Sequence, residues 1–151
     1  MHGKFEGYFE DFNSDLELVS PTLTVSEGML ANYLAVSGDY NQIYTSDKFA
    51  KESVHKGRVL PSLMIFALAT GLFGRINGTQ DHGLAMLGQR WEFHNFARVG
   101  DTLVLKATFP TKRETRHRDR GIVTRNLKVF NQAGELIAST EGQMMQARYM
   151  G

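Results

Sequence analysis

A charge-free apolar segment, residues 62–73, is the feature that most constrains the fold of this chain. It reads SLMIFALATGLF and is bounded by Pro61 and Gly74. Proline favours the first position of a helix, and glycine favours its end. A helix that is apolar all round is buried on all sides. The sequence therefore predicts a central helix with the rest of the structure packed around it.

The second half of the chain has the alternating pattern that is typical of β-strands. Over residues 102–109, the apolar side chains of Leu103, Leu105, Ala107 and Phe109 fall on one face. Further strands are expected over residues 84–93, 121–130 and 135–148, with a hairpin turn at residues 131–134. Antiparallel strands and one buried helix predict an α+β arrangement in which the sheet wraps around the helix, the hotdog fold.

Shorter elements are expected in the first half. Residues 16–25 form an extended run, in which Pro21 indicates an edge or a bend. Thr24 and Glu27 have the spacing of a capping box, which predicts a helix that ends at Gly38. A polar turn and a short helical turn are then expected over residues 39–47 and residues 48–52.

Composition limits the classes of function. The chain of 151 residues fits one domain, expected over residues 1–151. Lys plus Arg is 17 and Asp plus Glu is 16, and the net charge of +1 gives no electrostatic case for binding nucleic acid or a membrane surface.

Further absences in the sequence limit the kinds of site and segment that this chain can contain. There is no cysteine, which excludes disulfides, thiol nucleophiles and Cys-based zinc sites. The five histidines lack the spacing of a metal motif, so no metal is expected. The beginning of the chain does not read as a signal peptide, and no apolar stretch is long enough to span a bilayer. We therefore expect a cytoplasmic protein.

Residues 33–44 carry a resemblance to a known family. They read YLAVSGDYNQIY, which resembles the hydratase motif of MaoC-like (R)-specific enoyl-CoA hydratases. That motif runs aromatic, small residues, Gly-Asp-x-Asn-Pro-aliphatic-His. Four further segments resemble other parts of the same family framework: residues 49–51, 57–59, 96–103 and 119–123. Taken together, the resemblance covers residues 8–148.

This resemblance implies a hotdog hydro-lyase that needs no metal or redox cofactor. Family members add water to trans-2-enoyl-CoA, or remove it from the (R)-3-hydroxyacyl thioester. They use an Asp–His dyad, a supporting Asn and a backbone N–H at the start of the central helix. Carried over by position, these are Asp39, Asn41 and the amide of Ser62.

The chain departs from the family at the catalytic histidine, whose position is occupied by Tyr44. Gln42 replaces the preceding proline, and Pro61-Ser62 replaces a His-Gly pair at the head of the central helix. A tyrosine, with an ordinary pKa of about 10, is a poor base near neutral pH but can orient water or donate a proton. Losing one acid–base group costs about 10²–10⁴-fold in rate.

Three interpretations follow from this departure. The first is a hydratase in which Asp39 is the base and Tyr44 helps it. The second is a hotdog thioesterase in which Asp39 activates water. The third is a catalytically silent subunit that binds acyl-CoA. Asp39 and Asn41 also suit a simple turn, and Tyr44 also suits packing in a loop.

The expected partner is an acyl-CoA or acyl-carrier-protein thioester. Lys56 and Arg58 are candidates to bind its phosphates, and Leu63 and Phe66 to line its acyl tunnel, although core packing also explains the latter two. A basic cluster over residues 112–120 is expected to be a solvated hairpin tip, with phosphate binding as the alternative. Because a hotdog sheet has open edges, we expect at least a homodimer.

Overall fold

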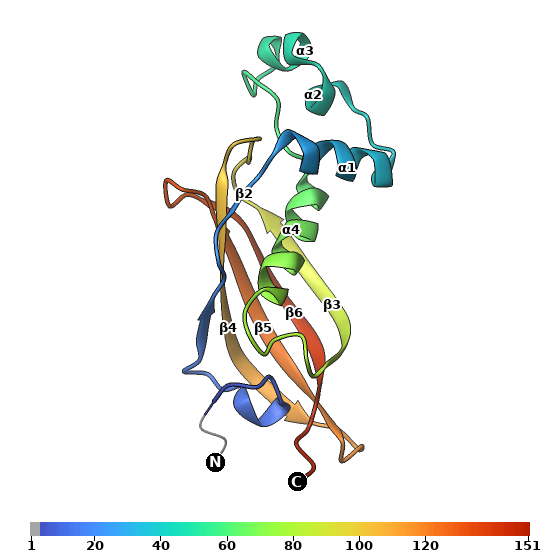
Figure 1. Ribbon diagram of the computed structural model, residues 1–151, viewed down its shortest axis with the longest axis vertical. Helices are drawn as coiled ribbons and strands as arrows, with labels where there is room; N and C mark the ends of the chain where they lie inside the picture. The colour runs from blue at the N-terminus through green and yellow to red at the C-terminus, as the bar shows by residue number, and fades with distance from the viewer. Residues whose placement is uncertain (1–3) are drawn as a thin grey trace.

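The computed structural model describes residues 4–151 as a six-stranded sheet with one long helix against it (Figure 1). The strands are β1 (Glu17–Val19), β2 (Leu23–Thr24), β3 (Gly83–Phe93), β4 (Thr102–Glu114), β5 (Arg120–Phe130) and β6 (Leu136–Ala147). The helices are the 3-10 turn η1 (Phe9–Asp11), α1 (Glu27–Ser37), α2 (Gln42–Thr45), α3 (Asp47–Glu52) and α4 (Ser62–Gly74).

The sheet is antiparallel and runs in the order β1-β4-β5-β6-β3, with β2 also paired to β4. β4 continues to Glu114, past the end expected at Phe109. Pro110 cannot donate to the ladder, and the register shifts between Thr108 and Thr111. The strand therefore survives its proline as a bulge.

Helix α4 packs on one face of the sheet, as the alternating strands predict. Its buried residues are Met64, Ile65, Ala69, Leu72 and Phe73. The four alternating residues of β4 from Leu103 to Phe109 are buried in the same core cluster. The prediction of a helix packed against a half-buried sheet is confirmed.

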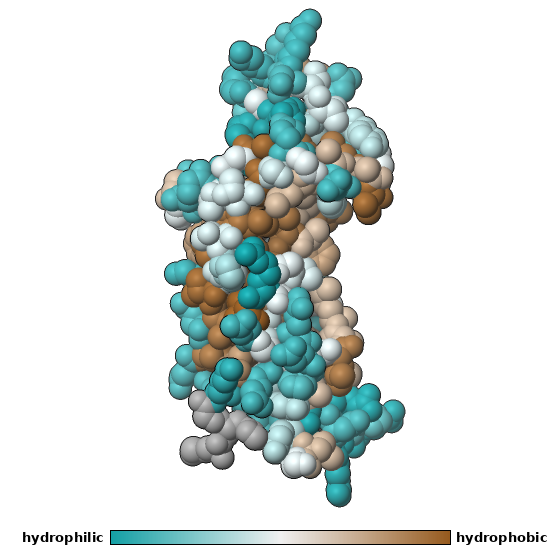
Figure 2. All heavy atoms as spheres, in the orientation of Figure 1, coloured by the Kyte–Doolittle hydropathy of each residue, from teal (hydrophilic) through white to brown (hydrophobic). Residues whose placement is uncertain are grey.

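The prediction that α4 is buried on all sides is wrong within one chain. Leu63 keeps 63% of its surface exposed, and Ala67, Thr70 and Gly71 are also exposed. The sheet of one chain covers one side of the helix, so the opposite stripe meets solvent. Figure 2 shows hydrophobic atoms gathered over the middle of this face, with hydrophilic atoms at both ends. Among the helices of residues 4–151, none has the length and hydropathy required to span a bilayer.

Helices α1 to α3 form the end of the molecule nearest the start of α4, opposite η1 and the C-terminus (Figure 1). The N-cap of α1 is Ser26, whose hydroxyl accepts from the amide of Met29 at 3.2 Å. Thr24, expected as the cap, instead lies in β2 and shares a hydrogen bond of 2.8 Å with Thr102. Gly38 ends α1 as predicted, in the left-handed conformation with φ 70°.

Candidate active site

The loop that carries Asp39 and Asn41 begins where α1 ends. Asp39 is exposed, and its amide donates to the hydroxyl of Ser37 at 3.2 Å. Asn41 is the N-cap of α2, with its side-chain oxygen accepting from the amide of Ile43 at 3.1 Å. The expected polar turn is therefore partly helical, because Asn41 begins a helix there. The Asp39 carboxylate is left facing solvent.

Tyr44 lies on α2, half-buried against the hydrophobic core. Burial raises the pKa of its hydroxyl, and the negative charge of Asp39 and the nearby Tyr33 raise it further. The hydroxyl stays protonated near neutral pH, so Tyr44 can donate a hydrogen bond or a proton but cannot accept one as a general base.

The head of α4 offers backbone donors. The first intrahelical bond runs from the amide of Met64 to the carbonyl of Pro61, at 3.0 Å, so the amides of Ser62 and Leu63 precede the helical ladder. Both lie at the positive end of the helix dipole. The Ser62 side chain is exposed.

A small hollow of about 60 Å³ opens at this helix end. It is lined by Leu60, Ser62, Ile65, Phe93, His94, Asn95, Phe96 and Ala97. Neither Asp39 nor Asn41 lines it, and it is far smaller than the roughly 300–1,000 Å³ of ordinary ligand sites. One chain therefore presents the donors and the carboxylate separately, with no room in this hollow for a whole acyl-CoA.

Arg58 connects three parts of this end of the molecule. Its guanidinium pairs with the carboxylates of Glu27 on α1 and Asp47 on α3, the latter at 2.6 Å. It also donates to the backbone carbonyl of Tyr44 at 3.4 Å. The two carboxylates raise its pKa. These contacts give Arg58 a positioning role for Tyr44, and its contact with a substrate phosphate stays a prediction.

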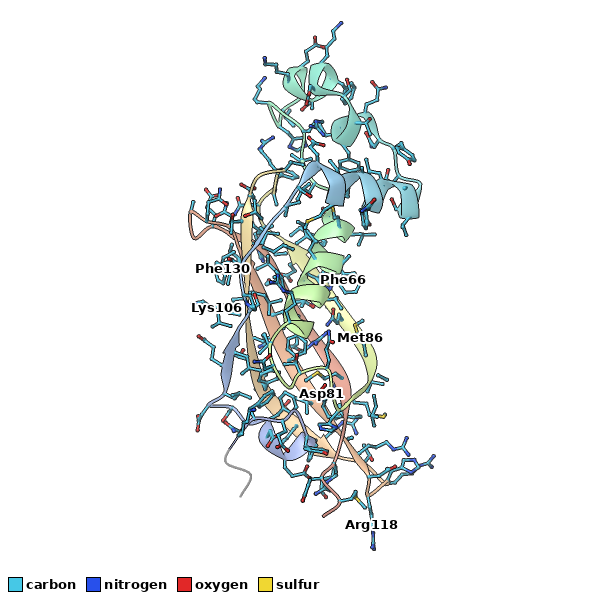
Figure 3. All side chains as sticks on the ribbon, viewed as in Figure 1. Phe66, Asp81, Met86, Lys106, Arg118 and Phe130 are labelled. Carbon is cyan, nitrogen blue, oxygen red and sulfur yellow. The ribbon has the colours of Figure 1, made fainter. Side chains whose placement is uncertain are left out.

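Lys56 lies in the exposed loop before α4 and has a positive φ of 57°. Arg98 holds this loop by donating to the carbonyls of His55 at 2.6 Å and Arg58 at 2.9 Å. The basic cluster is remote from it within one chain, since Figure 3 places Arg118 at the opposite end from α2 and α3.

The two predicted acyl-lining residues lie on the side of α4 away from the sheet centre. Leu63 is exposed, while Phe66 is half-buried with its ring centre 5.4 Å from that of Trp91 on β3. The indole of Trp91 donates to the side-chain oxygen of Gln89 at 3.1 Å. These rings form an apolar contact between α4 and the edge strand.

Sequence reasoning missed Arg125, a charged residue on the buried face of β5. It has the same parity as Val123, Leu127 and Val129, which the alternating pattern places on the inner face. This place in the alternating pattern is the sequence feature that predicts a buried side chain at Arg125. No three His, Asp or Glu side chains within residues 4–151 gather closely enough to hold a metal ion.

The chain matches the family model of the MaoC like domain over residues 15–130. It belongs to the MaoC-like domain family. This membership and the positions of α4 and the sheet confirm the family and the hotdog fold that the sequence predicted.

Known relatives of this MaoC-like domain are distant. It is 27% identical to Protein MaoC of Klebsiella aerogenes over 109 residues, which cover 72% of this chain and 32% of that protein. The chain thus spans about a third of the length of that curated relative.

Three solved structures are similar in fold. The MaoC-like dehydratase from Rhodospirillum rubrum has a TM-score of 0.83 and 19% identity, covering 94% of this chain and 97% of that one. R-hydratase PhaJ1 from Pseudomonas aeruginosa has a TM-score of 0.76 and 22% identity, and the match covers 94% of this chain and 86% of that one. A conserved hypothetical protein from Mycobacterium tuberculosis with a double hotdog fold has a TM-score of 0.87 and 18% identity, and the match covers 97% of this chain and 46% of that one. At these identities, the likeness concerns the fold alone.

Proposed function

We propose that this MaoC-like domain is an (R)-specific hydratase or dehydratase of acyl thioesters, adding water to a trans-2-enoyl-CoA or carrier-protein thioester or removing it. The observation that carries the proposal is the placement of Asp39 and Tyr44 at the positions of the family's catalytic dyad, on the loop after α1 and the short helix α2 that follows it. The R-hydratase PhaJ1 among the similar folds fits this reaction class.

In the proposed hydration, the Asp39 carboxylate accepts a proton from water as the water oxygen bonds to the β-carbon. The C=C electron pair moves toward the thioester carbonyl, whose oxygen gains negative charge. The amides of Ser62 and Leu63 donate to that oxygen, at the positive end of α4. Asp39 then returns the proton to the α-carbon, and the protonated Tyr44 orients the water. Asn41 fixes the loop by capping α2.

We further propose that the working unit is at least a homodimer, in which a second copy completes the site. Strand β3 forms a sheet edge of eleven residues, with β6 as its neighbour. Its exposed apolar side chains keep 41–52% of their surface: Leu84, Met86, Leu87 and Phe93. An apolar open edge of this length favours strand pairing with another copy. Such a pairing would extend the walls around the small hollow at Ser62.

The deciding experiment is a spectrophotometric assay of purified protein with short and long trans-2-enoyl-CoA. We expect hydration, and a loss of about 10²–10⁴-fold in Asp39→Asn, which cannot accept the proton. Asp15→Asn is the matched control, because Asp15 is an exposed aspartate outside the proposed chemistry and outside the contacts of Arg58. Release of free thiol instead of hydration would indicate a thioesterase.

A catalytically silent acyl-thioester-binding subunit is the second candidate. The raised pKa of Tyr44 favours it, because the side chain that replaces the family's histidine cannot serve as a base. Tight binding of acyl-CoA without any turnover, in wild type and Asp39→Asn alike, would establish this candidate in place of the first.

A further inference from the structure

A second hollow, of about 270 Å³, lies at the other end of α4. Its walls are the last turns of α4 and the beginning of β3, and its floor is β5 and β6. The lining residues are Thr70, Phe73, Gly74, Thr79, Gln80, Gly83, Leu84, Ala85, Met86, Arg125, Met144 and Gln146. No aspartate or glutamate is among them, so Arg125 carries the one formal charge of this lining.

Arg125 is buried without an acidic partner. Its side chain keeps 6% of its surface exposed. The guanidinium lies 4.4 Å from the ring centre of Phe73, and one terminal nitrogen contacts the sulfur of Met144 at 3.8 Å, a weak acceptor. Its Nε has no hydrogen-bond partner among residues 4–151. The guanidinium therefore contacts an aromatic ring and a thioether sulfur, whereas a buried cation is ordinarily paired with a carboxylate.

Burial without a counter-charge has a measurable cost. Desolvation lowers the pKa of Arg125 to about 10, so the guanidinium still carries its proton at neutral pH. An unpaired buried charge destabilises the fold unless a ligand or partner compensates it. A chain that keeps arginine at this position, where an apolar residue would pack, is arranged to meet an anion.

Gln89 is a second buried donor in the same row of the sheet, although it does not line the hollow. Arg125 pairs in register with Gly142 on β6, and Gly142 pairs with Gln89 on β3. A Cβ at Gly142 would lie 2.6 Å from the Cγ of Gln89, which shows that the glutamine side chain lies across the glycine. Its amide nitrogen, like the Nε of Arg125, is buried without a partner among residues 4–151. Two unsatisfied donor groups thus belong to one row across three strands.

The last carbonyls of α4 do not serve as the missing acceptors. The carbonyl of Phe73 accepts from the hydroxyl of Thr79 at 2.7 Å, and those of Gly71 and Leu72 accept from the amide of Arg75. The negative end of the helix is therefore already bonded within its own turn.

We propose that the Arg125 hollow binds a carboxylate at the far end of the acyl chain, so that the substrates are thioesters of dicarboxylic acids. This inference rests on the proposed function and specifies its substrate class. Arg125 offers N–H groups of its guanidinium to the carboxylate in a charge-assisted bond. A methyl-ended chain would leave the guanidinium without an acceptor.

The length of α4 sets the length of such a chain. From Ser62 to Phe73 the helix rises about 16 Å, at 1.5 Å per residue. A chain laid along the side of α4 nearest β3 would cross Phe66 and then reach Met86, which lines the Arg125 hollow (Figure 3). The exposed side chain of Leu63 lies at the start of this path. A thioester carbonyl at the head of the helix and a carboxylate near Arg125 are therefore joined by a medium-length acyl chain.

The test compares pairs of CoA thioesters that differ only at the far end of the chain. Octanoyl-, decanoyl- and dodecanoyl-CoA are each matched with the analogue in which a carboxylate replaces the terminal methyl, and binding is measured by calorimetry. We expect wild type to bind the best carboxylate-ended analogue about 10- to 100-fold more tightly than its partner, as a buried charge-assisted bond implies. Arg125→Met should bind both members of each pair alike.

Two controls separate this effect from general loss of charge or of fold. Lys128→Met removes an exposed cation from the same strand and should keep the preference. Arg125→Lys keeps the positive charge and should keep part of the preference for the carboxylate-ended thioester. Arg125→Met should melt at or above the wild-type temperature, because it removes an uncompensated charge.

Each other outcome identifies what has failed. Equal binding of both ends by wild type overturns the carboxylate site and leaves the proposed function intact. Failure of every thioester to bind overturns both. A change from dimer to monomer in Arg125→Met, seen by light scattering, would assign the missing carboxylate to a second copy of the chain and overturn the proposal.

Discussion

At the scale of single residues, Tyr44 is the departure from the family motif that most affects the proposed chemistry. Burial and the negative charge of Asp39 raise the pKa of its hydroxyl, and both effects hold its proton in place. The proton acceptor in the proposed reaction is therefore Asp39 alone. This division of labour differs from the Asp–His dyad of the family, in which histidine titrates near neutral pH.

Replacing Tyr44 by histidine tests that division. We expect Tyr44→His to raise the hydration rate by up to about 10²–10⁴-fold, because it restores a neutral-pH base beside Asp39. The gain should appear as pH rises through about 6.5, the ordinary pKa of histidine, in a pH–rate profile. Tyr33→His, on the neighbouring helix, is the control. No gain at any pH would show that the loop does not present position 44 to the substrate.

Residues that the family motif names could be predicted from the sequence, and residues that depend on partners in space could not. Asp39 and Asn41 follow Gly38 as the motif requires, and Asn41 caps α2. The alternating pattern of β5 predicts that the Arg125 side chain faces the core. Whether an acidic partner lies beside it depends on β6 and α4, which are distant in sequence. The pairing of Arg58 with Glu27 is equally non-local.

At the scale of elements, Arg58 ties α1 and α3 together and contacts the carbonyl of Tyr44 on α2. The helices α2 and α3 are short, and four to six residues have little stability of their own. The position of the Tyr44 side chain therefore depends on these ion pairs as much as on helix propensity.

Removing this connection should loosen the end of the molecule without unfolding it. We expect Arg58→Met to speed hydrogen exchange in α2 and α3 and to cost about 0.5–1 kcal/mol, since the paired carboxylates are exposed. Arg90→Met, which removes an exposed pair with Glu92, is the control. Unchanged exchange in both variants would contradict the positioning role.

The same connection has a defined pH dependence. The hydrogen bond from Arg58 lowers the pKa of Glu27 in the folded state. The stabilisation from the Arg58–Glu27 pair is therefore fully present above the unfolded-state pKa of glutamate, about 4.3. It is lost as the pH falls through the lower pKa that Glu27 has in the folded state. The stability difference between wild type and Arg58→Met should shrink over that acidic range.

The regular elements were predictable because their patterns are local. The apolar run predicts α4, and the alternating patterns predict β4 to β6. Three of the expectations from the sequence were wrong because of tertiary contacts. Pro110 was tolerated as a bulge, and Ser26 rather than Thr24 caps α1 because Thr24 pairs with β4. The outer side of α4 is exposed because the covering of a helix depends on the width of the sheet, which no local pattern encodes.

At the scale of the whole molecule, the unpaired edge at β3 is the surface on which the proposed assembly depends. Its exposed apolar residues reach both hollows: Phe93 lines the hollow at Ser62, and Leu84 and Met86 line the hollow at Arg125. A second copy that pairs along this edge would cover both the strand and part of the exposed side of α4.

A charge on the edge should prevent that pairing. We expect Leu87→Lys to sediment as a monomer where wild type sediments as a dimer, because a lysine on an edge strand opposes strand addition. Val19→Lys places the same charge on β1 at the other edge and should leave the dimer intact. Identical sedimentation of wild type and both variants would assign the interface to another surface.

Under the proposed assembly, the separation of Asp39 from the hollow at Ser62 within one chain would make the reaction rate depend steeply on the concentration of the protein. If two copies complete each site, a dilute solution contains mostly half-built sites. The rate then grows with the square of the protein concentration until pairs predominate, and linearly beyond. Synthesis of more chain would thus switch the reaction on more sharply than the rise in copy number itself.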